Sequence, residues 1–180
     1  MAGPKLLGAV LAGGKATRFG SDKALALLDG RPLIEHAIAA LEPYVAQIVV
    51  CGREDKRWTC LADRPAPDLG PLGGLAAALL CAQDQGFDAV LSTGCDMPSL
   101  PADLAEALIG EGPAIVAGQQ LIGFWPASLA DRLIDHLEHC SSRSIRGWMA
   151  VASPREIVPP GDPLPNINRP EDLIDWSRRR

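Results

Sequence analysis

Three short apolar runs constrain the fold of this chain more than any other feature of its sequence. They cover residues 6–11, 48–51 and 89–92, and a glycine follows each run within two residues. Continuous apolar runs of this length are typical of strands that are buried on both faces. Amphipathic segments of helical period separate the runs. This alternation predicts an α/β fold of three layers, in which helices cover both faces of an open, mainly parallel sheet.

Helices are predicted where apolar residues recur at the helical period. Proline opens four of these segments, because its fixed φ suits the first helical position. The four begin at Pro32, Pro101, Pro126 and Pro170, and a fifth helix covers residues 72–80. Two strands at residues 115–117 and 121–125 are expected to meet at a tight turn of residues 118–120, and residues 157–158 mark a last strand.

The composition narrows the class of protein. The 180 residues fit a single domain, residues 1–180, and the formal net charge of −5 argues against nucleic acid or an anionic membrane as the main partner. No apolar stretch reaches the roughly 18 residues of a membrane span. Five cysteines without a Cys-x-x-Cys pair favour reduced thiols. A cytoplasmic enzyme is expected.

Residues 11–23 carry the most chemical information. They read Leu-Ala-Gly-Gly-Lys-Ala-Thr-Arg-Phe-Gly-Ser-Asp-Lys and directly follow the first apolar run. Gly13 and Gly14 leave backbone amides open to a phosphate. Arg18 can bind phosphate oxygens through two parallel hydrogen bonds, and Lys23 supplies a point-like positive charge. The segment therefore predicts a phosphate-binding loop at the carboxyl edge of the sheet, where open α/β sheets bind ligands.

Two commoner phosphate loops are excluded by spacing. The dinucleotide-binding fingerprint requires Gly-x-Gly-x-x-Gly, which this loop lacks. A P-loop ending at Gly14 and Lys15 would need glycine at position 9 and serine or threonine at position 16, where the chain has Ala9 and Ala16. The loop therefore belongs neither to a nicotinamide site nor to a Walker-type NTPase.

A second candidate lies after the third apolar run. Asp96 follows Gly94 and precedes Pro98, so its carboxylate is expected at the same edge of the sheet. Magnesium prefers one or two carboxylates together with substrate phosphates, and Asp96 can supply such a ligand. Ser99 is the better cap for the helix at Pro101, which leaves Asp96 free for a metal ion.

Three later segments complete the pattern that residues 11–23 begin. They read Gly-Pro-Leu-Gly-Gly at residues 70–74, Cys-Asp-Met-Pro at 95–98 and Asn-Ile-Asn-Arg-Pro-Glu-Asp-Leu at 166–173. In this order the segments resemble those of the molybdenum cofactor guanylyltransferases, with Phe19 where that family usually has methionine. The resemblance spans nearly the whole chain. It implies the Rossmann-like nucleotide-diphospho-sugar transferase fold, also called glycosyltransferase-A-like.

The resemblance also implies a reaction and its partners. The reaction is transfer of GMP from GTP to the terminal phosphate of molybdopterin with release of pyrophosphate, and Mg²⁺ is the cofactor. Transient contact with other cofactor-biosynthesis proteins or with molybdoenzymes is expected. A phosphate acceptor is already ionised at neutral pH, so no general base is required.

The site residues follow from the resemblance and the loop chemistry together. The implied nucleotide-binding residues are Leu11, Ala12, Gly13, Lys23, Asp63 and Asp96, to which the loop chemistry adds Gly14. Asp96 is the implied magnesium ligand, and Arg18, Lys23 and Asp96 are the predicted catalytic residues. Asn166 and Asn168 are similar to asparagines on the acceptor side of the family's site. Asp68 competes with Asp63 for the nucleotide, because it lies nearer to residues 70–74.

Four other features bear on these assignments. Cys51 stands where the family often has asparagine, and residues 119–125 lack the family's His-Pro pair. His136 and His139 are expected to be surface residues on a solvated helix face, and a zinc site there is not expected, because their spacing fits no closed site. Gly13 and Gly14 favour GTP, but a cytidylyltransferase or another small-molecule nucleotidyltransferase of the same fold, or a non-catalytic nucleotide-binding module, remains the alternative.

Overall fold

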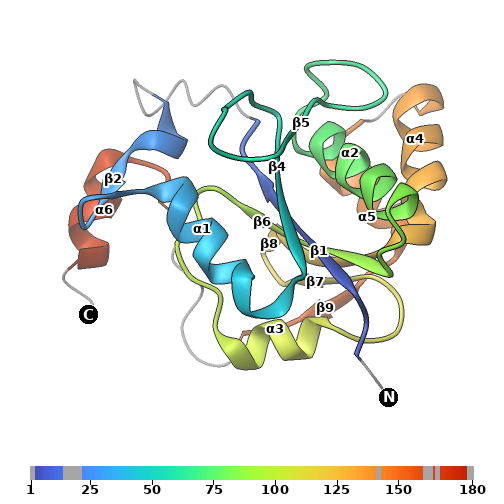
Figure 1. Ribbon diagram of the computed structural model, residues 1–180. Coiled ribbons are helices and arrows are strands. Elements are labelled where there is room, and N and C mark those ends of the chain that lie inside the picture. The colour runs from blue at the N-terminus through green and yellow to red at the C-terminus, as the bar shows by residue number, and fades with distance from the viewer. Residues whose placement is uncertain (1–2, 14–21, 141–142, 160–163, 165–166, 178–180) are drawn as a thin grey trace.

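A sheet forms the middle layer of the molecule in the computed structural model, which describes residues 3–13, 22–140, 143–159, 164 and 167–177 (Figure 1). Within these residues the sheet has seven strands, in the order β5-β4-β1-β6-β8-β7-β9. The strands are β1 (Leu6–Leu11), β4 (Gln47–Cys51), β5 (Cys60–Leu61), β6 (Ala89–Gly94), β7 (Ala114–Val116), β8 (Gln119–Pro126) and β9 (Arg155–Ile157).

The strands that precede the candidate loops are parallel and end level with one another. β1 pairs in parallel with both β4 and β6, and Leu11 lies opposite Cys51 on one side and Gly94 on the other. β8 is antiparallel to β6 and β7, whereas β9 is parallel to β7. The prediction of a mainly parallel α/β sheet is confirmed, with β8 as the antiparallel member. Because the three strands end together, the loops that follow them start side by side.

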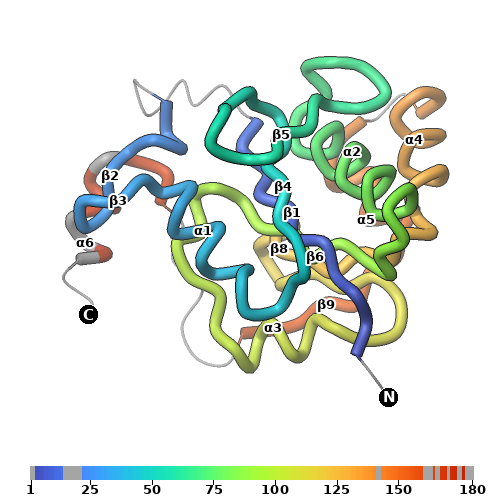
Figure 2. Tube along the Cα trace, viewed as in Figure 1, coloured from blue at the N-terminus to red at the C-terminus, as the bar shows by residue number. Residues whose placement is uncertain are grey.

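Helices cover both faces of the sheet (Figure 1). Helices α1 (Leu33–Leu41) and α3 (Ala102–Leu108) lie on one face, and α2 (Pro71–Asp84), α4 (Ala130–His139) and α5 (Ile145–Ala152) lie on the other. Helix α6 (Pro170–Ser177) packs beside the hairpin of β2 (Leu27–Leu28) and β3 (Arg31–Pro32), as the chain trace shows (Figure 2). Short 3-10 turns are η1 (Lys23–Leu25), η2 (Glu42–Tyr44) and η3 (Ala127–Leu129). No helix in the described part of the chain is long and apolar enough to cross a membrane.

The first strand shows why its sequence is apolar throughout. Leu7 and Leu11 face the cluster under α2, α4 and α5, whereas Leu6 and Val10 face the cluster under α1 and α3. All six residues of β1 are buried. Full burial of a side chain of this size stabilises the fold by about 1.5–3 kcal/mol. Because both faces of β1 pack against apolar clusters, apolar and polar residues do not alternate along this strand.

Some local predictions were wrong. Strand β8 begins at Gln119, so Gln119 and Gln120 belong to the strand, and the turn is confined to Ala117 and Gly118. A register shift between Ile115 and Val116 accommodates this tighter connection. Ser99 does not cap α3, whose N-cap position is Pro101 without a side-chain hydrogen bond.

The placement of His136 was also predicted wrongly. Its side chain is 4% exposed, and its ring centroid lies 5.7 Å from that of Trp148. Helix α5, which the sequence did not predict, supplies Trp148 and covers this face of α4. His139 is exposed as expected and pairs with Asp135 at 3.0 Å.

Candidate functional site

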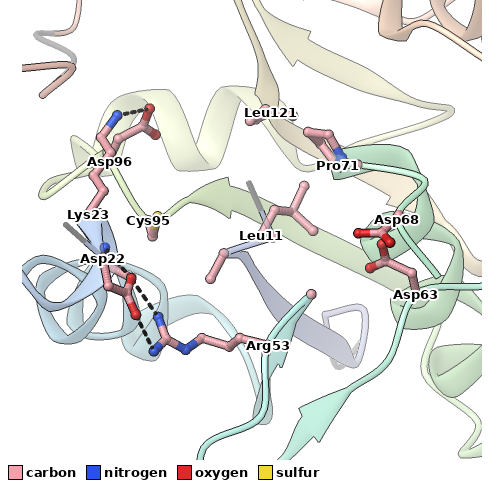
Figure 3. Close-up of a pocket in the computed structure, with 15 residues that line it drawn as sticks. Leu11, Asp22, Lys23, Arg53, Asp63, Asp68, Pro71, Cys95, Asp96 and Leu121 are labelled. Carbon is pink, nitrogen blue, oxygen red and sulfur yellow. Dashed lines mark hydrogen bonds and ion pairs between the residues drawn. The ribbon is translucent and has the colours of Figure 1, made fainter. Parts of the chain in front are cut away.

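A cavity of about 780 Å³ opens at the edge where β1, β4 and β6 end (Figure 3). Six of the residues predicted for the site line it: Leu11, Ala12, Gly13, Lys23, Asp63 and Asp96. Gly14, Arg18 and Asn166 lie outside the described residues. The loop after β1 and the loop that carries Asp96 therefore share one cavity, as their positions after parallel strands require.

The chain leaving β1 packs against the chain leaving β4. Ala12 N donates a hydrogen bond to the carbonyl of Cys51 at 2.9 Å. A Cβ on Gly13 would lie 2.9 Å from the Cα of Gly52, and Gly52 has a φ of 79°. Neither position admits a side chain without displacing the other loop. Gly13 thus has a packing role in addition to its predicted contact with phosphate.

Lys23 lies at one end of the cavity. Its Nζ donates to Oδ2 of Asp96 at 3.0 Å and to Oδ1 of Asn168 at 3.2 Å. The side chains of Lys23 and Asp96 are 14% and 21% exposed, respectively. Asp22 accepts a hydrogen bond from Ala24 N at 3.1 Å and thereby caps η1, the turn that contains Lys23. The local structure therefore fixes the base of the Lys23 side chain.

The direction of Asp96 is set by its surroundings. Its carboxylate lies over Gly94, where a Cβ would collide with Oδ1. Met97 N donates to the carbonyl of Gly94 at 3.2 Å, and Ile167 N donates to the carbonyl of Asp96 at 3.1 Å. The tight turn after β6 and the segment before α6 together hold this carboxylate in the cavity.

Arg53 is a cavity residue that sequence reasoning missed. Its guanidinium donates to both carboxylate oxygens of Asp22, at 2.9 and 3.3 Å, and its side chain is 14% exposed. It follows Gly52 at the end of β4, as the glycine loop follows β1. This equivalent position at the edge of the sheet is the signal that could have found it. Arg53 is a second cation of the cavity wall, and it lies against Asp22, whereas Lys23 is turned toward Asp96 (Figure 3).

The cysteines of this edge are poor nucleophiles. Burial raises the pKa of Cys95, a cavity residue, to about 11. Burial likewise raises the pKa of Cys51, which is fully buried at the end of β4. Both thiols therefore stay protonated at neutral pH, and covalent catalysis by cysteine is not expected.

The opposite end of the cavity is acidic. Asp63 and Asp68 both line it, and their carboxylates point toward each other (Figure 3). Burial raises the pKa of Asp63, and the charge of Asp68 raises it further, while a hydrogen bond from the backbone of Leu69 opposes both effects. A Cβ on Gly73 would lie 2.9 Å from the Cβ of Asp63. The glycines at the start of α2 therefore make room for this aspartate.

A metal ion at this site would depend on Asp96. Among the described residues no group of three or more histidine, cysteine or acidic side chains is placed to hold a metal. Asp96 is a partly exposed carboxylate in the cavity wall, which fits an ion that takes one protein carboxylate and completes its shell with phosphate oxygens and water. Magnesium fits this donor set, and a closed zinc site does not.

The family model and the curated relatives that match this chain agree with each other. Residues 8–157 match the family model described as the MobA-like NTP transferase domain. The chain is 36% identical to a molybdenum cofactor guanylyltransferase of Rhodobacter capsulatus over 181 residues, which cover 94% of this chain and 93% of the relative. It is 33% identical to a protein of the same name from Acidiphilium cryptum over 184 residues, covering 95% and 93%. The crystal structure of molybdopterin-guanine dinucleotide biosynthesis protein A from Archaeoglobus fulgidus matches with a TM-score of 0.70 at 22% identity, covering 97% of this chain and all of that one.

Proposed function

This chain belongs to the MobA-like NTP transferase family, and we propose that it transfers the guanylyl group of GTP to the terminal phosphate of molybdopterin. The names of its relatives support both substrates. The observation that carries the proposal is the cavity itself, which has cations and Asp96 at one end and a partly buried carboxylate at the other. That arrangement suits a molecule with phosphates at one end and hydrogen-bond donors at the other.

The reaction forms one bond and breaks one. An oxygen of the acceptor's terminal phosphate bonds to the α-phosphorus of GTP, and the bond from this phosphorus to the oxygen bridging to the β-phosphate breaks. Pyrophosphate leaves with that electron pair. The attacking phosphate is already ionised, so positioning and charge neutralisation carry the step.

The phosphate end would bind the triphosphate. Leu11, Ala12 and Gly13 line the cavity, and Lys23 would offset negative charge on the departing pyrophosphate. Gly14 and Arg18, outside the described residues, complete the proposed loop. Asp96 would hold Mg²⁺. When bound, this ion would polarise phosphate oxygens and neutralise part of their charge.

The acidic end would bind guanine. Guanine presents N1–H and its 2-amino group side by side as donors, and an ionised carboxylate has two acceptor oxygens to receive them. Asp63 is the proposed partner, because it is held by packing against Gly73 and is more buried than Asp68. Donors from guanine would also relieve the cost of keeping this carboxylate ionised away from water.

The acceptor side of the site is proposed to include the segment that precedes α6. Asn166 and Asn168 are proposed to face molybdopterin, by the resemblance of their segment. Asn168 does lie at the phosphate end, beside Lys23, where an acceptor phosphate would have to approach. We also propose a cytoplasmic location, because five cysteines without a Cys-x-x-Cys pair are typical of a protein that keeps its thiols reduced.

The test is release of pyrophosphate by the purified protein with molybdopterin, Mg²⁺ and GTP, CTP or UTP in turn. We expect release with GTP that depends on molybdopterin and little with either pyrimidine nucleotide. Release with CTP alone would replace the guanylyl assignment by a cytidylyl one. Binding of GTP without any release would identify a nucleotide-binding module instead.

A further inference from the structure

Lys23 forms an ion pair with Asp96, the residue that would bind the metal ion in the proposed function. Its ammonium lies 3.0 Å from Oδ2 of Asp96, and both side chains are largely shielded from solvent. An ion pair in such a setting is screened less by water and salt than one on the surface. In the nucleotide-free protein Asp96 therefore already has a cationic partner.

Asn168 holds the ammonium in that position. Its Oδ1 accepts a hydrogen bond from Lys23 at 3.2 Å, although 145 residues separate the two in the chain. The backbone of Asn168 is fixed in turn, because its N–H donates to Asp172 at 2.7 Å and the neighbouring Ile167 N donates to the carbonyl of Asp96 at 3.1 Å. Lys23 is thus held by two oxygens, and only one of them belongs to the predicted metal ligand.

The Asp96 carboxylate has little freedom to turn away from this partner. It lies over Gly94, and the backbone on both sides of Asp96 is hydrogen bonded. A magnesium ion coordinates carboxylate oxygen at about 2.1 Å. An ion at that distance would lie within a few ångströms of the Lys23 ammonium, and two positive charges so close repel each other strongly in a partly buried site.

We propose that Asn168 is a positioning residue that, together with Asp96, holds Lys23 across the metal-binding carboxylate, so that a divalent cation is accepted only with the nucleotide. The proposal rests on Asp96 as the metal ligand. A triphosphate supplies the missing counter-charge: Lys23 moves from Asp96 to phosphate oxygens and frees the carboxylate. The described residues offer no alternative cluster of three metal ligands that would hold the ion without nucleotide.

Positioning of Lys23 is a role of Asn168 that is distinct from acceptor binding. If Asn168 only contacted molybdopterin, its loss would change the KM for the acceptor and leave metal binding in the absence of acceptor untouched. If it positions Lys23, its loss changes metal binding before any acceptor is added. The two roles therefore differ in a readout that does not depend on turnover.

The experiment is titration of the purified protein with Mn²⁺, followed by electron paramagnetic resonance, with and without a GTP analogue whose α,β-bridging oxygen is replaced by methylene. In Lys23→Met we expect Mn²⁺ alone to bind about tenfold more tightly than in the wild type, because a neighbouring positive charge is gone. The same variant should bind Mn²⁺ with the analogue more weakly. Asn168→Ala should strengthen binding of Mn²⁺ alone by about threefold, as expected for one lost hydrogen bond to a charged group at an exposed position.

Matched controls are available on the same chain. Lys56→Met removes an exposed lysine, and Gln83→Ala removes an exposed amide on α2, and neither residue lines the cavity. Both controls should bind Mn²⁺ as the wild type does. A general structural defect in Lys23→Met would weaken Mn²⁺ binding with and without the analogue, so opposite shifts are diagnostic.

Failure of the inference differs from failure of the proposed reaction. Unchanged or weaker binding of Mn²⁺ alone in Lys23→Met overturns the inference, as does an Asn168→Ala variant altered only in the KM for the acceptor. If Asp96→Asn does not weaken Mn²⁺ binding with the analogue, both the metal assignment and the inference are wrong. Opposite shifts in a protein that releases no pyrophosphate would sustain the inference and refute the reaction.

Discussion

The two ends of the cavity differ in whether their charged side chains are paired with an opposite charge. At the phosphate end each described cation has an anionic partner, since Lys23 pairs with Asp96 and Arg53 pairs with Asp22. At the acidic end Asp63 and Asp68 face each other, and no cation is paired with either among the described residues. The cations of the phosphate end can exchange their carboxylate partners for phosphate oxygens, whereas the acidic end gains from any ligand that brings donors. A purine nucleoside triphosphate with a metal ion satisfies both ends at once.

The largest effect on activity is expected from substitution of Asp96 at the phosphate end. In Asp96→Asn we expect kcat to fall about a thousandfold, because loss of the proposed metal ligand removes several kcal/mol of charge stabilisation. Pyrophosphate release measures the effect, and circular dichroism checks that the fold is intact. Asp84→Asn, on the exposed face of α2, is the control. Activity within tenfold of the wild type in Asp96→Asn would remove this residue from the reaction.

The proposed contact of Asp63 with guanine is tested by changing the hydrogen bonds that this side chain can form. In Asp63→Asn we expect GTP to bind about 10- to 100-fold more weakly, because a charged acceptor for two donors is lost. Xanthosine triphosphate should gain in the same variant, since its 2-oxo group can accept from the new amide. Competition binding of the two nucleotides measures the exchange. Asp68→Asn is the matched control, and a switch of base preference there instead would assign guanine to Asp68.

Substitution of Arg53 tests whether this side chain contributes to binding of the phosphates and not of the base. In Arg53→Met we expect the KM for GTP to rise about fivefold, as for loss of one partly screened charge near the phosphates. Binding of guanosine should not change, because the acidic end is intact. Arg57→Met serves as control, since Arg57 pairs with Asp55 in the same bidentate manner but outside the cavity. Equal losses for GTP and guanosine would show that Arg53 supports the fold only.

The smallest expected effect concerns stability and pH. Burial raises the pKa of Asp63 in the folded protein above its value in the unfolded chain. The unfolded chain therefore ionises first, and stability falls as pH rises from about 4 through the folded pKa. Asp63→Asn should raise Tm on the order of 1 °C at pH 7, because Asp63 is only partly buried, and the gain should vanish near pH 4. A gain of equal size at both pH values would contradict this origin.

The parts of the fold that the sequence predicted are those with a strong local pattern. Strands β1, β4 and β6 each contain a short apolar run, and α2 contains apolar residues that recur at the helical period. Strands β2, β3 and β5 have two residues each, so no period can be read from them. Helix α5 is only eight residues long, and its Trp148 packs against the rings of Trp125 and His136, which lie on other elements.

The candidate site also contains residues that the sequence predicted and residues that it did not. The glycine loop and Asp96 could be placed at one edge, because parallel strands end at the same side of a sheet. Arg53 was missed, because a lone arginine after a strand carries no motif. The contact of Asn168 with Lys23 could not be foreseen either, since it depends on how residues 167–177 return to the edge of the cavity, and the two residues are 145 positions apart in the chain.

The most direct test of the two-ended cavity is a crystal structure with Mn²⁺ and the α,β-methylene analogue of GTP, with the metal located by its anomalous scattering. The account predicts a manganese peak bonded to Asp96 and to phosphate oxygens, Lys23 turned from Asp96 to the triphosphate, and guanine against Asp63. A metal bound away from Asp96, or a base lying at the Lys23 end, would contradict it.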